Sequence, residues 1–309
     1  MMRVAALSIG YGAPTGDFDG RVEAAYPRAC VLLLDDHGLL TLVTPTIGRL
    51  PRGVVVDAPP EFAFAPGVAI GAAAAARSGI LRIRGAALAV DLRAAPLWRS
   101  PLGFLKIDGM RDAVARALET AGAALRQDGR SDLFMRLAGA RLAALGAATR
   151  ALDAPTAEKA MSGLVGLGDG LTPAGDDYLI GYFAGLWACA GAEPLRMNFV
   201  AALGQWLKQA ARDAGRISRV YLEAIANGET SERLFDLASA VAAGSDHAAV
   251  DRAVTAALAV GHSSGACGVL GFLQACASWS NETPIEGDPE FGASEGRTRP
   301  SLFWSRYAS

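Results

Sequence analysis

The residues best suited to chemistry lie in segment 166–177, GLGDGLTPAGDD, where a glycine-rich turn leads into an apolar helix. Gly166, Gly168 and Gly170 can adopt positive φ angles and let a ligand approach the main chain closely. Thr172 followed by a proline predicts a helix start, with the threonine hydroxyl as N-cap. Because the N–H groups at a helix start carry partial positive charge, this segment predicts a binding site for a phosphate or carboxylate.

Two acids, Asp176 and Asp177, follow in the first turn of this predicted helix. A carboxylate there could act as a base, orient a ligand amide or hold a metal ion. The alternative is that both acids only complement the helix dipole. Adjacent helical residues point in different directions, so Asp176 is the stronger catalytic candidate and Asp177 the second. Asp169 and Gly175 complete the set of ligand-binding residues expected in this segment.

A second candidate is the segment 261–265, GHSSG, which predicts another helix start and another anion site. Ser263 or Ser264 would cap the helix, and Gly265 would lie against the ligand. His262 could donate a proton, or it could be a hydrogen-bonded structural residue. No Gly-x-Ser-x-Gly elbow surrounds Ser263, so a serine nucleophile is not expected.

A third candidate is the segment 215–219, GRISR, which also predicts a helix start. Ser218 is the expected cap. Arg216 or Arg219 could hold a phosphate or carboxylate through two hydrogen bonds, whereas the alternative is that both are solvated surface arginines.

The composition favours a protein with a large dry core. Of the 309 residues, 51% are hydrophobic and 19% are charged, and the mean hydropathy is +0.26. The net charge is −2, without the basic stripe that a phosphate backbone requires, so nucleic acid is not an expected partner. The longest apolar run, residues 178–192, is shorter than the roughly 20 residues that span a bilayer. No membrane association is therefore expected.

The four cysteines lie far apart, and no two form a Cys-x-x-Cys pair. This spacing argues against a disulfide framework and against a zinc site. We expect reduced, mostly buried thiols in a cytoplasmic protein. The chain also lacks the Gly-x4-Gly-Lys-Ser/Thr loop of nucleotide-binding enzymes, so a self-contained kinase is not expected.

The N-terminal third is predicted to form strands, and the rest of the chain helices. Short runs rich in Val, Ile and Leu predict strands over residues 30–34, 39–43, 53–57, 68–71, 80–84 and 87–92. Residues 35–38, DDHG, predict a hairpin between the first two. Apolar periodicity then predicts helices over residues 110–127, 132–152, 156–164, 173–190, 194–214, 218–227, 231–243, 247–260 and 264–279.

These elements predict an α+β protein. A small β-barrel or sandwich-like domain would occupy residues 1–107, and an all-helical domain carrying the glycine-rich segment would occupy residues 108–280. Residues 281–309 predict an irregular tail, whose aromatic end could dock onto the body or a partner. Gly181 and Gly185, four residues apart, indicate that another helix packs closely against the helix that carries them.

Three motifs together, GLGDGLTPAGDDYLIG, RISRVYLEAIANGE and GHSSGACGVLGF, resemble the AllH family. The resemblance extends from about residue 21 to about residue 277. The family's named member is a subunit of oxamate carbamoyltransferase. The resemblance therefore implies a complex of different subunits in ureide and purine-nitrogen breakdown, which transfers a carbamoyl group between oxalurate or oxamate and phosphate.

Three hypotheses follow for function. The first is an enzyme subunit that binds a small anion such as carbamoyl phosphate or oxamate, without a redox cofactor. The second is a non-catalytic subunit that shapes a partner's active site. The third is a stand-alone metal-dependent hydrolase or phosphotransferase. No metal site is firmly implied, although magnesium on Asp176 and Asp177 is compatible with the preference of hard cations for carboxylates.

Overall fold

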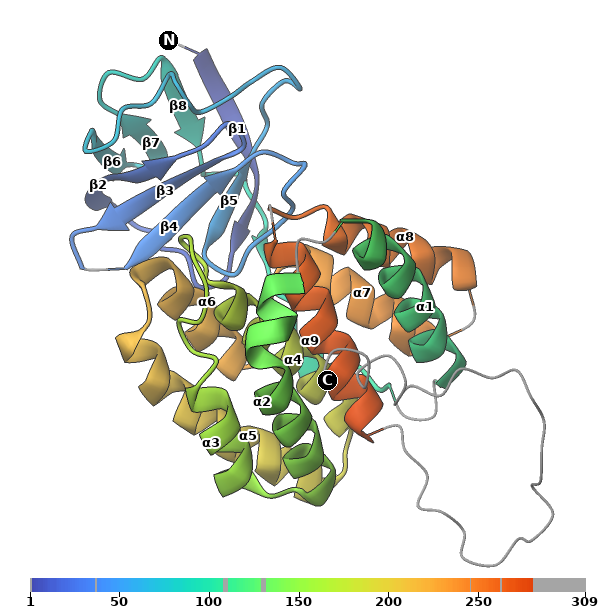
Figure 1. The fold of residues 1–309 in the computed structure, drawn as a ribbon. Coiled ribbons are helices and arrows are strands. Elements are labelled where there is room, and N and C mark those ends of the chain that lie inside the picture. The colour runs from blue at the N-terminus through green and yellow to red at the C-terminus, as the bar shows by residue number, and fades with distance from the viewer. Residues whose placement is uncertain are drawn as a thin grey trace, which may run out of the picture. The chain divides into compact units, whose positions relative to one another are not determined.

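The computed structural model describes residues 2–36, 38–107, 111–128, 132–244, 246–261 and 263–279. The predicted tail, His37 and His262 lie outside these residues. The chain divides into two compact units, which we call the β unit and the helical unit. The β unit comprises Met1–Pro101 and Glu229–Arg233, and the helical unit comprises Leu102–Gly228 and the residues from Leu234 on. The predicted α+β class is confirmed (Figure 1).

The β unit is a closed barrel. Its strands are β1 (Met2–Gly10), β2 (Phe18–Ala25), β3 (Ala29–Leu34), β4 (Leu39–Val43), β5 (Gly53–Val56), β6 (Ala73–Arg77), β7 (Ile80–Ile83), β8 (Leu88–Asp91) and the short β9 (Leu97–Trp98). The order is β5-β4-β3-β2-β6-β7-β8-β1, and β1 pairs back onto β5. The first half of β1 pairs in parallel with β8, and its second half pairs antiparallel with β5. This closure decides between the two architectures that the sequence left open.

Five of the six predicted strands are confirmed, as β3, β4, β5, β7 and β8. β3 and β4 form the predicted hairpin, with Leu34 N donating to Gly38 O at 2.8 Å. The strand predicted over residues 68–71 is absent, and the strand in this region is β6, four alanines and an arginine. Alanine has low strand propensity, so pairing with β2 and β7 decides the conformation of β6. The sequence patterns do not predict β1, β2 or β9.

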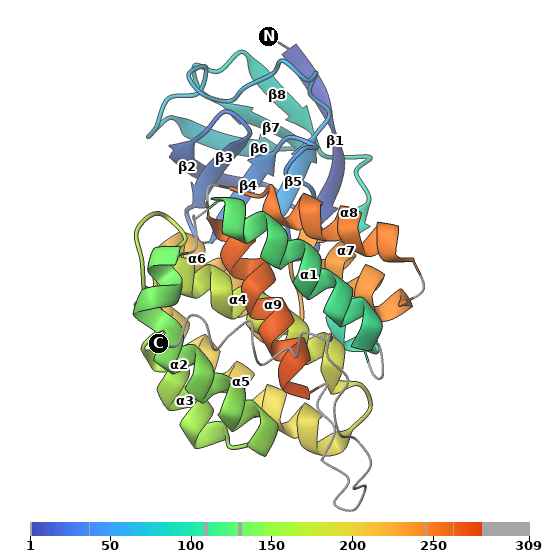
Figure 2. The same cartoon turned by 45° about the vertical axis from the view of Figure 1, so that its right-hand side comes forward.

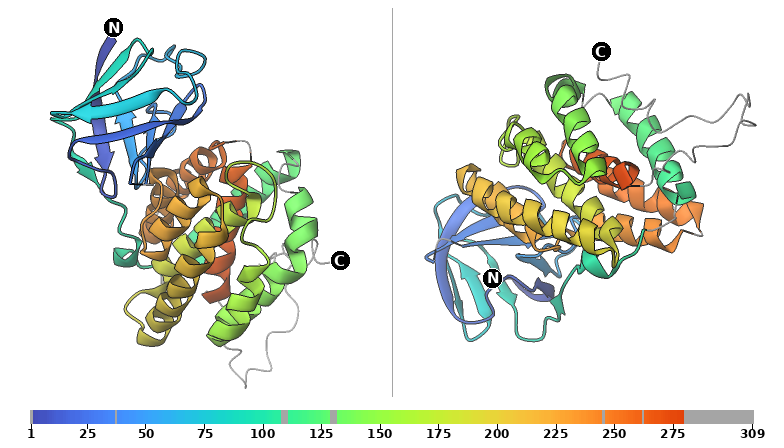
Figure 3. Two further views of the ribbon diagram at one scale, coloured as in Figure 1. Left: turned by 90° about the vertical axis from the view of Figure 1, so that its left-hand side faces the viewer. Right: turned by 90° about the horizontal axis from the view of Figure 1, so that it is seen from below.

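Every predicted helix is confirmed within the described residues, with shifts of a few residues at the ends. The helices are α1 (Arg111–Asp128), α2 (Asp132–Ala151), α3 (Ala154–Ser162), α4 (Ala174–Ala190), α5 (Pro194–Ala210), α6 (Arg216–Ala226), α7 (Glu232–Ala243), α8 (His247–Leu258) and α9 (Ser264–Trp279). α4 and α9 lie side by side in the middle of these helices, as Figure 2 and Figure 3 show. No helix in the described part of the chain is long and apolar enough to cross a membrane.

Glycines bring α4 and α9 into close parallel contact. A Cβ atom on Gly181 would lie 1.8 Å from the carbonyl oxygen of Gly268, and one on Gly271 would lie 2.1 Å from that of Tyr178. Such distances are far below contact, so a side chain at either position would push the helices apart. The close packing inferred from Gly181 and Gly185 is thus confirmed. It also sets the N-termini of both helices at the same end of the pair.

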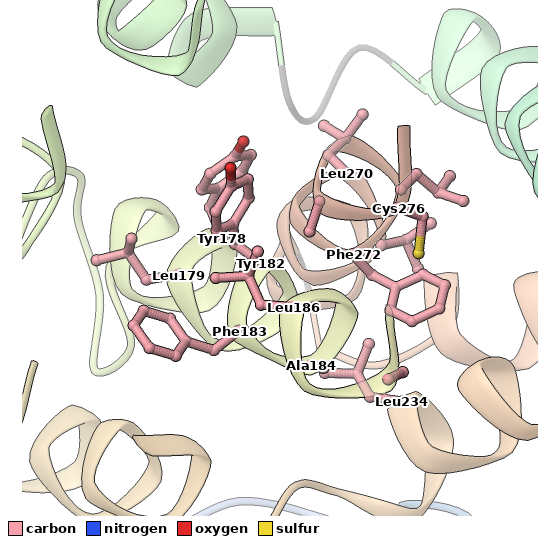
Figure 4. Close-up of a cluster of buried hydrophobic side chains, with 14 of the residues drawn as sticks. Tyr178, Leu179, Tyr182, Phe183, Ala184, Leu186, Leu234, Leu270, Phe272 and Cys276 are labelled. Atoms are coloured by element: carbon pink, nitrogen blue, oxygen red, sulfur yellow. The ribbon is translucent and has the colours of Figure 1, made fainter. Parts of the chain in front are cut away.

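Large side chains surround this glycine seam. Tyr178 and Tyr182 project together from α4, with ring centroids 5.9 Å apart, while Phe183 points to the other side of the helix (Figure 4). The Tyr178 hydroxyl donates to Gln274 Oε1 on α9, and Gln274 Nε2 donates to a carbonyl of α2 at 2.5 Å. These buried polar groups are therefore paired, as their burial requires.

The four cysteines are buried and form no disulfide. Cys189 on α4 and Cys276 on α9 lie with their sulfur atoms 3.5 Å apart. The expectation that the thiols are buried is confirmed.

Candidate functional site

The three predicted helix starts meet in the helical unit. The Thr172 hydroxyl, just before α4, lies 3.1 Å from the hydroxyl of Ser264, the first residue of α9. From α6, the Ser218 hydroxyl donates to Leu171 O at 3.5 Å. Segments separated by about fifty and ninety residues thus converge around Leu171 and Thr172. We call this place the helix-start site.

The glycines of the loop have the backbone angles that the sequence predicts. The φ angles are 72° at Gly166, 110° at Gly168 and 102° at Gly170. Two other glycines are required by packing. A Cβ on Gly175 would lie 2.0 Å from Leu164 O, and one on Gly265 would lie 2.3 Å from Ala257 O. The ligand-binding roles expected for these two glycines stay predictions, because packing alone explains their presence.

Asp176 is fully buried at the helix-start site, with 0% exposure. Its Oδ1 accepts a hydrogen bond from Gly166 N at 2.8 Å, so the carboxyl closes the loop onto α4. Burial raises the pKa of this carboxyl, and the bond from Gly166 N together with the nearby Ser218 hydroxyl partly offsets that rise. The other oxygen, Oδ2, is buried and has no hydrogen-bond partner among the described residues.

Asp177 is buried as well, with 7% exposure. Burial raises its pKa to about 7, the hydroxyls of Ser264 and Thr172 oppose the rise, and the charge of Asp176 adds to it. Its Oδ2 likewise finds no partner in the described part of the chain. The two acids therefore point to different neighbours, as adjacent helical residues must, yet both are withdrawn from water.

The burial of this pair does not fit the alternative in which both acids only complement the helix dipole. A helix N-terminus stabilises an acid by up to about 2 kcal/mol, even in a partly buried position. Removing one carboxylate from water without giving it a partner costs several kcal/mol of folding free energy, which is more than the helix dipole returns. Neither acid forms an ion pair within the residues described. Buried acids in which one carboxyl oxygen has no partner among the described residues are typical of functional sites.

Comparison with family models identifies the family. A model described as oxamate carbamoyltransferase subunit AllH matches residues 164–276, which contain all three helix starts. A second model, the AllH family N-terminal domain, matches residues 6–97. The chain belongs to the AllH family. No curated protein and no solved structure matches it. The AllH match begins just before the glycine-rich loop and ends within α9, so it covers the whole helix-start site.

The capping predicted for this AllH chain is wrong at two helices. At α4 the N-cap is Pro173, which has no side-chain cap, and the Thr172 hydroxyl bonds to Ser264 instead. At α6 the N-cap is Gly215, and Ser218 is a buried residue of the first turn. Tertiary contacts thus take up the hydroxyls that the local pattern assigned to capping.

At α9 the predicted cap position is occupied by Ser263. Its carbonyl accepts the first helical hydrogen bond, from Cys267 N at 3.0 Å. At two helix starts some N–H groups are already used. Gly175 N donates to Leu167 O at 2.8 Å, and Gly265 N donates to Val260 O at 2.9 Å. Asp176 N also donates, to Pro173 O at 2.9 Å, so an anion at this site has to bind the remaining first-turn N–H groups.

The candidate arginines differ in what they contact. The Arg219 guanidinium donates to the carbonyls of Ala211 and Arg212, so it stabilises the turn after α5. Arg216 is exposed at the first residue of α6, and Asp169 is exposed in the glycine-rich loop. A ligand-binding role for Arg216 and Asp169 stays a prediction.

The donors for magnesium at this site are two carboxylates and nearby hydroxyls. No group of three or more His, Cys, Asp or Glu side chains that could hold a metal occurs within the described residues. The converging helix N-termini also place positive partial charge here, which opposes a cation. Magnesium thus fits this site less well than a ligand that donates hydrogen bonds.

Proposed function

We propose that this chain is a subunit of a carbamoyltransferase-like complex and that it binds a small anionic ligand at the helix-start site. The observation that carries the proposal is the pair of buried carboxyl oxygens, Asp176 Oδ2 and Asp177 Oδ2, which have no partner among the described residues where three helices begin. Such groups cost folding free energy unless a ligand supplies their partners. The name of the family, oxamate carbamoyltransferase subunit, supplies the reaction class.

The groups at the site suit the steps of carbamoyl transfer. The reaction needs donors for a phosphate or carboxylate, donors for a carbonyl oxygen that gains negative charge, and a base for the attacking nitrogen. First-turn N–H groups of α4 and α9, with Arg216, would supply the donors. Asp177, whose pKa is about 7, can gain or lose a proton near neutral pH. Asp176 would orient the ligand, because Gly166 N already holds one of its oxygens.

The proposal extends to the setting of the reaction. Oxamate, oxalurate and carbamoyl phosphate are the proposed substrates, in the breakdown of purine-derived nitrogen compounds in the cytoplasm. Other subunits would complete the active site, because the family description names a subunit rather than a whole enzyme.

A thermal-shift titration of the purified chain tests the proposal. Carbamoyl phosphate, phosphate, oxamate and oxalurate are added separately, with and without magnesium. A ligand at about 100 times its Kd stabilises the folded state by about 2.7 kcal/mol. We expect a shift that Asp176→Asn abolishes and that Asp213→Asn, an exposed acid in the same unit, preserves. If no ligand shifts the melting temperature, or if Asp176→Asn responds like the natural chain, the proposed site is wrong.

One observation favours the second function, a subunit that shapes a partner's active site. Leu171, in the glycine-rich loop, is 48% exposed. An apolar side chain exposed beside buried acids is suited to contact a partner subunit. Leu171→Ser should then weaken assembly with partner subunits in a pull-down and leave the ligand shift intact. Unchanged assembly would remove the support for this role.

A further inference from the structure

The outward face of α2 carries a continuous apolar stripe. α2 lies at the outside of the helical unit (Figure 1 and Figure 2), and its buried face packs inward. On the opposite face, exposed apolar residues recur at alternating intervals of four and three, a spacing that aligns them along one side of a helix. The two leucines among them are 59% and 55% exposed. An apolar row of this length open to water is typical of a docking surface. We call it the α2 stripe, and it consists of Leu133, Leu137, Ala140, Ala144, Ala147 and Ala151.

Arginines lie beside the α2 stripe. Arg136, Arg141 and Arg150 are exposed on α2, and residues 133–151 contain no acid. Of the ion pairs among the described residues, none includes these three arginines. The surface is therefore apolar with basic edges. It suits a partner segment that combines apolar side chains with acids.

A second copy of this chain does not fit these charges. Leucine and alanine at this spacing would otherwise suit two α2 helices packed on each other. Such a pair would bring two sets of arginines together, and like charges across an interface oppose binding. No acid within residues 133–151 of either helix would offset them. The occupant of the α2 stripe is therefore expected to be acidic.

The chain itself supplies an acidic segment next to α2. Residues 282–295, ETPIEGDPEFGASE, contain five acids and no base, together with Ile285 and Phe291. This acidic segment begins three residues after Trp279, the last residue of α9. Trp279 Nε1 donates to Thr149 O at 3.0 Å, so α9 ends beside the last turn of α2. The acidic segment therefore starts close to one end of the α2 stripe.

The acidic segment is long enough to follow the whole stripe. From Ala151 to Leu133, α2 spans about 27 Å along its axis. Residues 280–291 alone can span about 40 Å when extended. Pro284 and Pro289 disfavour a helix in this part of the sequence, so the extended length is the relevant one.

We infer that the α2 stripe is the docking surface for the chain's own acidic segment, residues 282–295. Ile285 and Phe291 cover the leucines and alanines of the stripe, and the acids of the segment pair with the arginines beside it. Each exposed ion pair is weak, but the contact is intramolecular and acts at a high effective concentration. The inference does not depend on the helix-start site or on the proposed function.

Chymotrypsin cleavage after Phe291 measures this docking in the full-length chain. The reference is a synthetic peptide of residues 280–309 in the same buffer, which has no α2 to bind. The chain should be cleaved at least about fivefold more slowly than the peptide, because a docked segment is cut only when it opens. Salt at about 1 M shortens the Debye length to about 3 Å and should remove most of this protection.

Substitutions on α2 test whether the arginines hold the acidic segment. Arg136→Glu, Arg141→Glu and Arg150→Glu together should raise the cleavage rate to that of the peptide. Arg212→Glu, at an exposed arginine of the same unit outside α2, should keep the full protection. If the triple variant fails to fold, the comparison with the peptide and the salt dependence of the natural chain still decide.

A charge swap tests direct contact. Glu286→Lys, Asp288→Lys and Glu290→Lys, added to the triple-glutamate chain, should restore at least half of the protection. The reference is then a peptide that carries the same three lysines. A helix that was merely destabilised by its glutamates would not be rescued by substitutions in the acidic segment.

Three outcomes would overturn the inference. The first is equal cleavage of the natural chain and the peptide in low salt. The second is protection that persists in the triple-glutamate chain, because the acidic segment would then bind elsewhere. The third is a dimer of the natural chain, seen by gel filtration, that Leu137→Ser dissociates, because the α2 stripe would then face a second copy.

Discussion

Asp177→Asn should make the ligand-free protein more stable than the natural chain above pH 7. The carboxyl is 7% exposed, and burial raises its pKa from 3.8 to about 7. The folded state therefore binds the proton more tightly than the unfolded state. Between these two pH values the folded chain holds a proton that the unfolded chain has lost, so the free energy of unfolding falls as pH rises. The contribution of Asp177 is fully present below about pH 4 and is lost as pH rises through about 7.

The magnitude follows from the change in pKa. One pKa unit corresponds to about 1.4 kcal/mol, so the rise from 3.8 to about 7 destabilises the folded state by about 4 kcal/mol at high pH relative to low pH. Asparagine does not ionise and removes this loss. The figure is an upper bound for the variant, because the new amide brings two N–H groups that also need acceptors.

Urea unfolding over a pH series from mildly acidic to mildly alkaline buffer measures the effect on both chains. The variant's advantage should grow with pH across the series and level off above about pH 7. Asp213→Asn, an exposed acid in the same unit, should show no such pH-dependent advantage. A difference in unfolding free energy between the two chains that does not vary with pH would refute the burial argument for Asp177.

Three further substitutions test the packing that supports the site. Gly271→Ala places a Cβ 2.1 Å from Tyr178 O and should lower the free energy of unfolding by at least about 2 kcal/mol. Gly268→Ala, whose nearest atom is 3.7 Å away, should lower it by less than about 1 kcal/mol. Denaturant unfolding compares the two variants, and equal losses would contradict the close helix contact. Tyr178→Phe removes the donor to Gln274 Oε1 and should lower the unfolding free energy by about 1–3 kcal/mol, so an unchanged value would show that this oxygen finds another donor. Arg219→Ala should lower the melting temperature and leave ligand-induced shifts intact, and a lost phosphate shift would show that Arg219 binds the ligand.

The local features of the site were within reach of the sequence. The glycines at 166, 168 and 170 have the predicted positive φ angles, because glycine adopts these angles without the steric cost that other residues meet. Helices such as α4 and α9 were predictable from apolar runs bounded by proline and serine. The hairpin between β3 and β4 depends on a turn of only a few residues. Each of these signals lies within one short stretch of chain.

What only the tertiary structure decided involves residues far apart. The contact between Thr172 and Ser264 joins positions 92 residues apart, and it occupies hydroxyls that the local pattern assigned to capping. Asp177 was the weaker candidate by its position alone, and its raised pKa comes from burial beside α9. β6 is a strand because β2 and β7 pair with it, although its alanines favour helix. The sequence alone determined the conformations that a short segment prefers by itself; burial, electrostatics and the meeting of three helix starts depend on neighbours that only the folded chain brings together.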